Sequence, residues 1–407
     1  MRKKAAASLA AVLGCYAVVT AQQPATPRAA RPAVQTPPVL AFVPVKPIDP
    51  PARPLASEAR SANVTTFSFI AYGDTRSDYT GPADGEVLRA EHNRIVDVIL
   101  ARVKARASTP FPIRFVLQSG DAVLRGHFGK QWNVSFTPII ERLTHANIPY
   151  FFAAGNHDAD GHPGDSIRSL GLHNTLTAIS KLIPPEGAAR RLSGYPTYAF
   201  GYGNVFFIAI DSNIASDTIQ LAWAASQLDH LNRTRYRHVV AFFHHPPFSS
   251  GPHGGTAAAP ESTTPRVGNV ELPTAAVRDL WLPLFRRHHV RMIIAGHDHL
   301  YDHWAETYTD NGVRYRMDDL VTGGGGAPIY VYNGEPNLEA YLAAGASQQV
   351  RVEHLMKPGT TTAENPHHFV IVQVDGDKLS LEVVGSGPGV YAPYAGKSKI
   401  DISDTTR

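Results

Sequence analysis

The sequence predicts an α/β fold, because short apolar runs alternate with helical patterns from residue 63 onward. The first predicted strand is at residues 67–72, and a helix follows it in which Leu88, Ile95, Ile99 and Val103 recur at helical spacing. A second strand at 113–117, a helix at 136–143 and a third strand at 150–152 continue the pattern. This order of elements is typical of parallel strands joined by helices.

The second half of the chain repeats the alternation. A strand at residues 205–210 precedes a helix that carries Leu221, Trp223, Leu228 and Leu231. Strands at 239–243 and 290–295 flank a helix around residues 281–285. The last two strands, at 368–374 and 379–384, surround the turn sequence Asp-Gly-Asp and predict a hairpin.

Two long polar stretches interrupt this order, at about residues 159–200 and 249–273. Both are expected to be loops inserted into the domain. Loops of this length within a compact domain usually cover or form a binding site.

The N-terminus resembles an export signal. Arg2, Lys3 and Lys4 precede an apolar stretch, and small residues allow cleavage after Ala21. A lipoprotein signal that ends just before Cys15 is the alternative, and Cys15 is the one cysteine of the chain. We therefore expect a signal peptide at 1–21 and an exported protein, either periplasmic or secreted.

The domain limits follow from composition. Residues 22–61 are rich in Pro and Ala and are expected to be a disordered linker. The main folded domain is expected at 62–395 and a short tail at 396–407. The formal net charge of +3 gives no reason to expect a nucleic acid partner, and no later apolar stretch predicts a transmembrane anchor. The sequence gives no indication of the oligomeric state.

Chemically useful side chains follow the apolar runs. They occur in the segments Gly73-Asp74, Gly120-Asp121, Gly155-Asn156-His157-Asp158, His244-His245-Pro246-Pro247 and Gly296-His297-Asp298-His299. Ligands of α/β sheets bind beyond the carboxyl ends of the strands, so these segments should meet at one site. Carboxylate, amide and imidazole ligands together suit zinc, manganese or iron.

This ordered set of motifs resembles the calcineurin-like metallophosphoesterase superfamily, which includes the purple acid phosphatases, over roughly residues 65–330. The resemblance implies a four-layer α/β/β/α sandwich. It also implies hydrolysis of phosphate mono- or diesters of small molecules by a hydroxide that two metal ions (Fe, Mn or Zn) activate.

The resemblance also implies roles for individual residues. Asp74, Asp121 and His299 would bind the first metal, and Asp121 would bridge to a second metal bound by Asn156, His244 and His297. His157 would protonate the leaving group, and Asp158 would orient its ring.

Two positions depart from the family pattern. Many members have Asp-x-His in the first motif, where this chain has Asp74-Thr75-Arg76, and purple acid phosphatases have a metal-binding Tyr where this chain has Leu124. The first metal therefore lacks one protein ligand, and water, phosphate or another side chain such as His127 could take that place. His127 is also a candidate for binding substrate. Arg76 is expected at the mouth of the site, where its guanidinium would bind a phosphate oxygen.

Two other functions remain open from the sequence. One is a phosphodiesterase for cyclic nucleotides or lipid headgroups. The other is a non-catalytic protein that binds metal or phosphate, which the missing ligand favours and the His157 motif disfavours.

Overall fold

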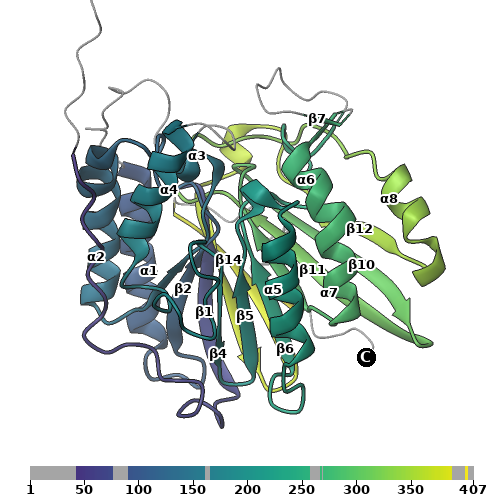
Figure 1. Cartoon of the computed structure of the whole chain (residues 1–407), viewed down its shortest axis with the longest axis horizontal. Coiled ribbons are helices and arrows are strands. Elements are labelled where there is room, and N and C mark those ends of the chain that lie inside the picture. The colour runs from purple at the N-terminus through teal and green to yellow at the C-terminus, as the bar shows by residue number, and fades with distance from the viewer. Residues whose placement is uncertain are drawn as a thin grey trace, which may run out of the picture. The chain divides into compact units, whose positions relative to one another are not determined.

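The computed structural model describes residues 43–76, 90–160, 166–256, 266–267, 269–386 and 399–401. Most of the strands belong to two large sheets, one of six strands and one of seven (Figure 1). A short third sheet pairs β7 (Arg266–Val267) with β8 (Val270–Glu271).

The first sheet has the strand order β15-β14-β13-β1-β2-β3. Its parallel half contains β1 (Thr66–Tyr72), β2 (Ile113–Gln118) and β3 (Tyr150–Phe152). Its antiparallel half contains β13 (His368–Asp375), β14 (Lys378–Gly385) and β15 (Lys399–Asp401). The predicted hairpin near the end of the chain is therefore confirmed. Its strand β13 pairs with β1 on the side opposite β2.

The second sheet has the order β12-β10-β11-β9-β6-β5-β4. Four adjacent strands are parallel: β5 (Val205–Ala209), β6 (His238–Phe242), β9 (Met292–Ala295) and β11 (Val313–Thr322). Antiparallel strands complete the two edges, namely β4 (Tyr198–Tyr202), β10 (Tyr301–Asp310) and β12 (Arg351–Met356).

Alternate residues of the second sheet face two different hydrophobic cores. In β5, Val205, Phe207 and Ala209 pack with residues of the first sheet, whereas Phe206 and Ile208 pack with helices. The helices on that outer side are α5 (Thr218–Asp229), α6 (Leu272–Ala276), α7 (Leu282–Arg287) and α8 (Glu339–Ala344). On the other side, α1 (Ala90–Arg106), α2 (Thr137–His145) and α4 (Ser166–Ile179) pack with the first sheet (Figure 1). The predicted α/β/β/α sandwich is thus confirmed.

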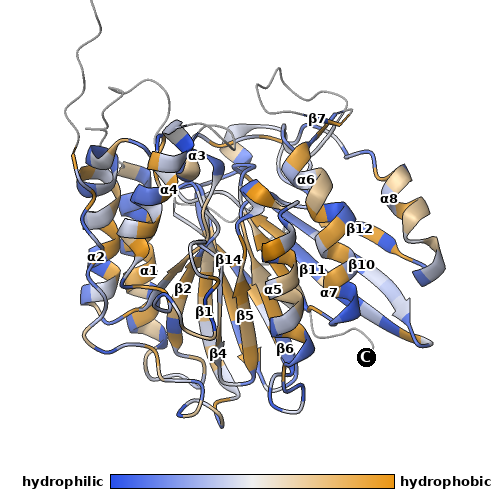
Figure 2. Cartoon of the chain, in the orientation of Figure 1, coloured by the Kyte–Doolittle hydropathy of each residue, from blue (hydrophilic) through white to orange (hydrophobic). Residues whose placement is uncertain are grey.

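The insertion at 159–200 is more ordered than the sequence predicted. Its described part contains α4 and, at its end, the edge strand β4. The hairpin of β10 and β11 was not predicted, because both strands carry many polar residues. Figure 2 shows the difference, since β1, β5 and β6 are largely orange whereas this hairpin has pale and blue stretches.

The prediction of a disordered linker is wrong for residues 43–61. Val45 and Ile48 are buried in the core, and the Ile48 amide donates a hydrogen bond to the Ala178 carbonyl. This stretch lacks periodicity because it binds to the domain as an extended segment. Residues 399–401 likewise form β15 instead of belonging to a tail.

The expected signal peptide and Cys15 lie outside the described residues. Within the described part of the chain, no helix has both the length and the apolar character needed to cross a membrane.

Candidate metal centre

The predicted site residues meet at the carboxyl ends of the parallel strands of both sheets. Three of them have a positive backbone φ, which is rare for residues other than glycine: Asp74 (59°), Asp121 (55°) and His297 (71°). Backbone strain of this kind occurs mainly at functional sites, where the surrounding structure enforces it. The positive φ turns each of these side chains away from the direction of its strand and toward the facing sheet.

Two glycines allow these turns to approach one another. A Cβ atom on Gly296 would lie 2.3 Å from Asp74 Oδ2, and one on Gly155 would lie 2.2 Å from Asp121 Oδ1. Any side chain at either position would therefore displace a carboxylate of the site.

Three ligand atoms converge from three different strand ends. Asn156 Oδ1 lies 2.8 Å from His244 Nε2 and 3.1 Å from His297 Nδ1, and the two ring nitrogens are 3.2 Å apart. Atoms bound at right angles to one ion, each about 2.1 Å from it, are about 3 Å apart. The spacing of the three atoms therefore fits a shared metal ion.

In each histidine ring, the nitrogen that faces away from Asn156 donates a hydrogen bond. The ring nitrogen that faces Asn156 therefore keeps its lone pair. His244 Nδ1 donates to the Ser119 carbonyl at 2.9 Å, and His297 Nε2 donates to Glu271 Oε2 at 2.8 Å. Each neutral ring thus turns an unprotonated nitrogen toward the Asn156 oxygen. Three acceptors facing one another repel unless a cation lies between them, and metal-binding histidines have the same outer hydrogen bonds.

Burial keeps the imidazoles of the site neutral. It lowers the pKa of His297 to about 4, with the nearby His253 as the second cause, and it also lowers the pKa of His244. A metal ligand must have a free lone pair, so neutral rings favour metal binding at neutral pH.

Asp121 adjoins this group. Its Oδ1 lies 3.4 Å from His244 Nε2. Burial by itself would raise the pKa of Asp121, but His244, His157 and Arg76 outweigh burial and hold that pKa below its usual value. Asp121 is therefore an ionised carboxylate that faces the converging nitrogens.

The residues predicted for the first metal have a different arrangement. His299 Nδ1 donates to the Pro328 carbonyl at 2.7 Å, which leaves Nε2 as an acceptor 3.5 Å from Asp74 Oδ1. The Asp74 carboxylate accepts the backbone N–H of His297 at 3.0 Å. Burial and the neighbouring Asp121 raise the pKa of Asp74 well above its usual value.

Arg76 lies inside the site and not at its mouth, where it was expected. Its side chain is 5% exposed. Its Nη2 is 3.4 Å from His299 Nε2, and its Nε is 3.4 Å from Asp121 Oδ2. The guanidinium thus contacts two of the three residues assigned to the first metal.

His157 is at the more exposed side of the site. Its Nδ1 donates to the Leu124 carbonyl at 2.7 Å, and its Nε2 lies 3.9 Å from Asp121 Oδ2. Burial, followed by the charge of Arg76, lowers its pKa to about 4.

The expectation that Asp158 orients the ring of His157 is wrong. Its two oxygens accept backbone N–H groups instead, from Asp121, Ala122, Val123 and Gly155. Asp158 therefore holds together the two turns that carry the ligands, and the Leu124 carbonyl orients His157.

His127 is not brought to the metal ligands. Its Nδ1 pairs with Asp160, and its ring packs against Phe128. Among the contacts within the described residues, none links His127 with the six predicted ligands.

Sequence reasoning missed Glu271, which lies in the second insertion. Besides His297, its carboxylate binds His253 Nδ1 at 2.8 Å and Arg266 Nη2 at 3.2 Å. Glu271, His245 and His297 also place ligand atoms within 4.8 Å of one another, as do Asp74, Asp121 and His244. Because the Glu271 oxygens already accept three N–H groups, we assign Glu271 to holding the His297 ring. Its position in a loop expected to border the site was the only sequence signal.

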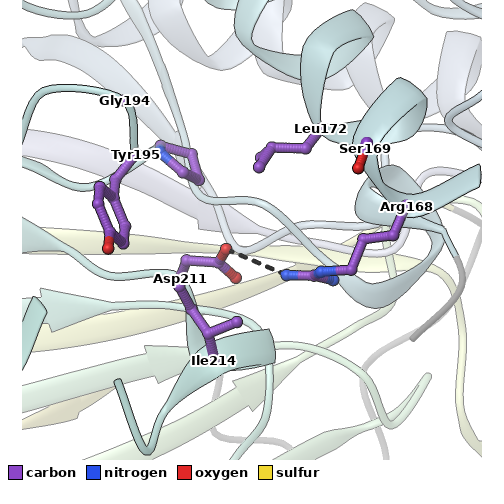
Figure 3. A pocket seen from close by; sticks show the side chains of 8 residues that line it. Arg168, Ser169, Leu172, Gly194, Tyr195, Asp211 and Ile214 are labelled. Atoms are coloured by element: carbon purple, nitrogen blue, oxygen red, sulfur yellow. Dashed lines mark ion pairs between the residues drawn. The ribbon is translucent and has the colours of Figure 1, made fainter. Parts of the chain in front are cut away.

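A cavity of about 370 Å³ is lined by residues of the first insertion together with Asp211 and Ile214 (Figure 3). Arg168 and Asp211 pair across it at 3.7 Å, and Leu172 and Tyr195 also line it. The next residue after Asp211, Ser212, accepts the backbone N–H groups of His244 and His245. The first insertion thus supplies part of the lining of this cavity, and Asp211 in the lining adjoins the residue that binds the His244 and His245 amides.

The sequence profile of the calcineurin-like phosphoesterases matches residues 90–301, more than half of the chain. The chain belongs to the calcineurin-like phosphoesterase family. Membership of this family is what the motifs predicted. No curated protein matches its sequence at a significant level.

Solved structures similar to this one include a purple acid phosphatase from seeds of yellow lupin (Lupinus luteus), at 17% identity and a TM-score of 0.54. That match covers 84% of this chain and 54% of the lupin chain, so this chain spans about half the length of that protein. Two others are GAP50, described as the anchor in the inner membrane complex of Plasmodium (14%, TM-score 0.49, 81% of this chain and 87% of that one), and PhoD (12%, TM-score 0.45, 81% and 68%). At these identities the likeness concerns the fold alone.

Proposed function

We propose that this phosphoesterase hydrolyses phosphate esters of small molecules with a metal ion held by Asp121, Asn156, His244 and His297. One observation carries the proposal, namely the convergence of an amide oxygen and two unprotonated ring nitrogens, 2.8–3.2 Å apart, beside an ionised carboxylate. Such a donor set suits manganese, zinc or iron.

A metal ion at this position supplies a Lewis acid for the phosphate and an activated water as nucleophile. The residues of the chain supply the remaining parts. Glu271 and the Ser119 carbonyl fix the tautomers of His297 and His244, so that both rings keep a lone pair toward the centre. Asp158 holds the turns that carry Asp121 and Asn156.

His157 is the proposed proton donor to the leaving oxygen. This role requires a proton on Nε2 in the substrate complex, where the negative charge of a bound phosphate would oppose the burial and the Arg76 charge that lower the pKa of His157. Its ring is oriented by the Leu124 carbonyl, so its Nε2 faces the centre. Its side chain is 16% exposed, against 2% or less for Asp121 and His244. A substrate that enters from the exposed side would therefore reach His157 first.

A turnover assay on an aryl phosphate and on the matching aryl phosphate diester tests the proposal. We expect hydrolysis that a strong chelator abolishes and that added Mn²⁺, Zn²⁺ or iron restores. Faster turnover of the diester would favour the phosphodiesterase alternative. Metal binding without turnover of either ester would favour a binding protein, and full activity after metal removal would refute the metal-dependent mechanism.

The export signal remains a prediction, and so do the periplasmic or secreted location and the lipoprotein alternative. Sequencing the N-terminus of protein expressed with residues 1–21 intact would test cleavage after Ala21. An N-terminus at Cys15 would instead indicate the lipoprotein signal.

A further inference from the structure

Arg76 lies where the family's first metal ion is expected. Asp74, Asp121 and His299 are the residues that the motifs assign to that ion. The guanidinium contacts Asp121 Oδ2 through Nε and His299 Nε2 through Nη2, both at 3.4 Å. Because Nδ1 of His299 donates to the Pro328 carbonyl, the lone pair on Nε2 is available to the arginine.

The backbone fixes Arg76 in this place. The φ of 59° at Asp74 turns the chain back, and the amides of Thr75 and Arg76 both donate to the Asp121 carbonyl at 3.0 Å. The Arg76 side chain is 5% exposed, so solvent offers it little compensation. A buried guanidinium that loses its acceptors is strongly destabilised.

The charge of Arg76 lies against the ligand atoms themselves, because its nitrogens are 3.4 Å from Asp121 Oδ2 and 3.4 Å from His299 Nε2. A divalent cation bound to the same carboxylate and imidazole would lie close to this fixed positive charge and would be repelled by it. The residues present therefore do not fit a metal ion in the first position.

We propose that the guanidinium of Arg76 takes the place of the first metal ion, so that this phosphoesterase works with one metal ion and one permanent organic cation. This inference rests on the proposed metal-dependent function and replaces the expected two-metal centre. An arginine can donate several N–H groups to carboxylate and phosphate oxygens at once, and it keeps its charge at any physiological pH. It would balance Asp121 without depending on metal supply.

Metal stoichiometry tests the inference. The full chain is stripped with a chelator and titrated with Mn²⁺, and bound manganese is measured by elemental analysis and by electron paramagnetic resonance. We expect one Mn²⁺ per wild-type chain and an uncoupled spectrum. Arg76→His removes the cation and creates the family's Asp-x-His motif, so it should bind two ions with a spin-coupled signal.

Two control variants isolate the cause. Arg76→Lys keeps a positive charge and should still bind one ion. Arg125→His adds an imidazole at an exposed position of the neighbouring loop and should also bind one ion. Two ions of similar affinity in the wild-type chain would overturn the inference, as would a single ion in folded Arg76→His. If Arg76→His does not fold, the wild-type stoichiometry decides alone.

The same samples separate this inference from the proposed function. Two ions in a wild-type chain that hydrolyses the aryl phosphate would overturn the inference and leave the function intact. Turnover in a wild-type chain that binds no ion would overturn both the function and the inference.

Discussion

Replacing Asp158 with asparagine should destabilise the protein more than most single substitutions do. The Oδ2 atom of Asp158 accepts the amides of Asp121 and Gly155, both at 2.8 Å. Its Oδ1 atom accepts those of Ala122 at 2.8 Å and Val123 at 3.2 Å. Asparagine has one acceptor oxygen, so in either orientation two amides lose their partner and face an NH₂ group.

The magnitude follows from the two lost bonds. A buried amide left without its acceptor costs about 1–3 kcal/mol, so two such amides should lower the free energy of unfolding of Asp158→Asn by about 2–6 kcal/mol. Whole domains are stable by about 5–15 kcal/mol, so the loss is a large share. Metal affinity should fall as well, because Asp158 joins the turns that carry Asp121 and Asn156.

Denaturant unfolding of the metal-free protein measures the effect, because bound metal would add its own stabilisation. The control is Asp97→Asn, in which the substituted side chain is 63% exposed and pairs with Arg142 on the surface. That change should cost about 0.2–1 kcal/mol. A loss below about 1 kcal/mol for Asp158→Asn, with an unchanged denaturant slope, would refute this account of the carboxylate.

Three further predictions concern single side chains. Glu271→Gln should weaken metal binding about 10–100-fold in titration calorimetry, because the His297 ring loses a charged acceptor, and an unchanged dissociation constant would contradict this role. His157→Ala should slow esters with poor leaving groups about 10²–10⁴-fold and nitrophenyl esters much less, whereas equal losses across a leaving-group series would exclude a proton donor. Burial lowers the pKa of His368 to about 4, below an unfolded value near 6.5, so its contribution to stability is complete above pH ~6.5 and is lost as the pH falls toward 4. In metal-free protein His368→Asn should lessen the fall in stability over that range by up to about 3 kcal/mol, and parallel pH profiles would contradict the assignment.

The strand ends that form the centre could be predicted from sequence because their signal is local. Each is an apolar run followed by a glycine or a histidine, and parallel strands necessarily bring such ends to one edge of a sheet. The long β10–β11 hairpin gave no such signal. Its buried positions include Asp302, which pairs with His354, and Asp318, which pairs with His303. Polar residues that pair with one another inside a sheet remove the apolar alternation by which strands are recognised.

The roles of Asp158 and Arg76 could not be predicted because both depend on backbone direction. The motif places Asp158 next to His157, yet the turn at Gly155 aims its carboxylate at backbone amides. Arg76 follows Asp74 by two residues. The positive φ of Asp74 determines whether the Arg76 side chain points into the site or toward solvent. The spacing of the motifs in the sequence predicts which residues lie near one another. The backbone φ angles determine which of their atoms face the site.

The charges of the side chains support the proposal that one metal ion is sufficient to attract a phosphate. Burial lowers the pKa of His244, His297 and His299, so among the six predicted ligands and Arg76 the charged side chains are Asp74, Asp121 and Arg76. These three charges sum to minus one, or to zero if Asp74 holds a proton as its raised pKa allows. A single divalent ion would make this set of side chains positive in either case, and Arg76 would supply the charge that a second ion would otherwise add. Phosphate would therefore bind after the metal ion. The positive charge of its binding site would then be divided between the exchangeable metal ion and Arg76, which is covalently part of the chain.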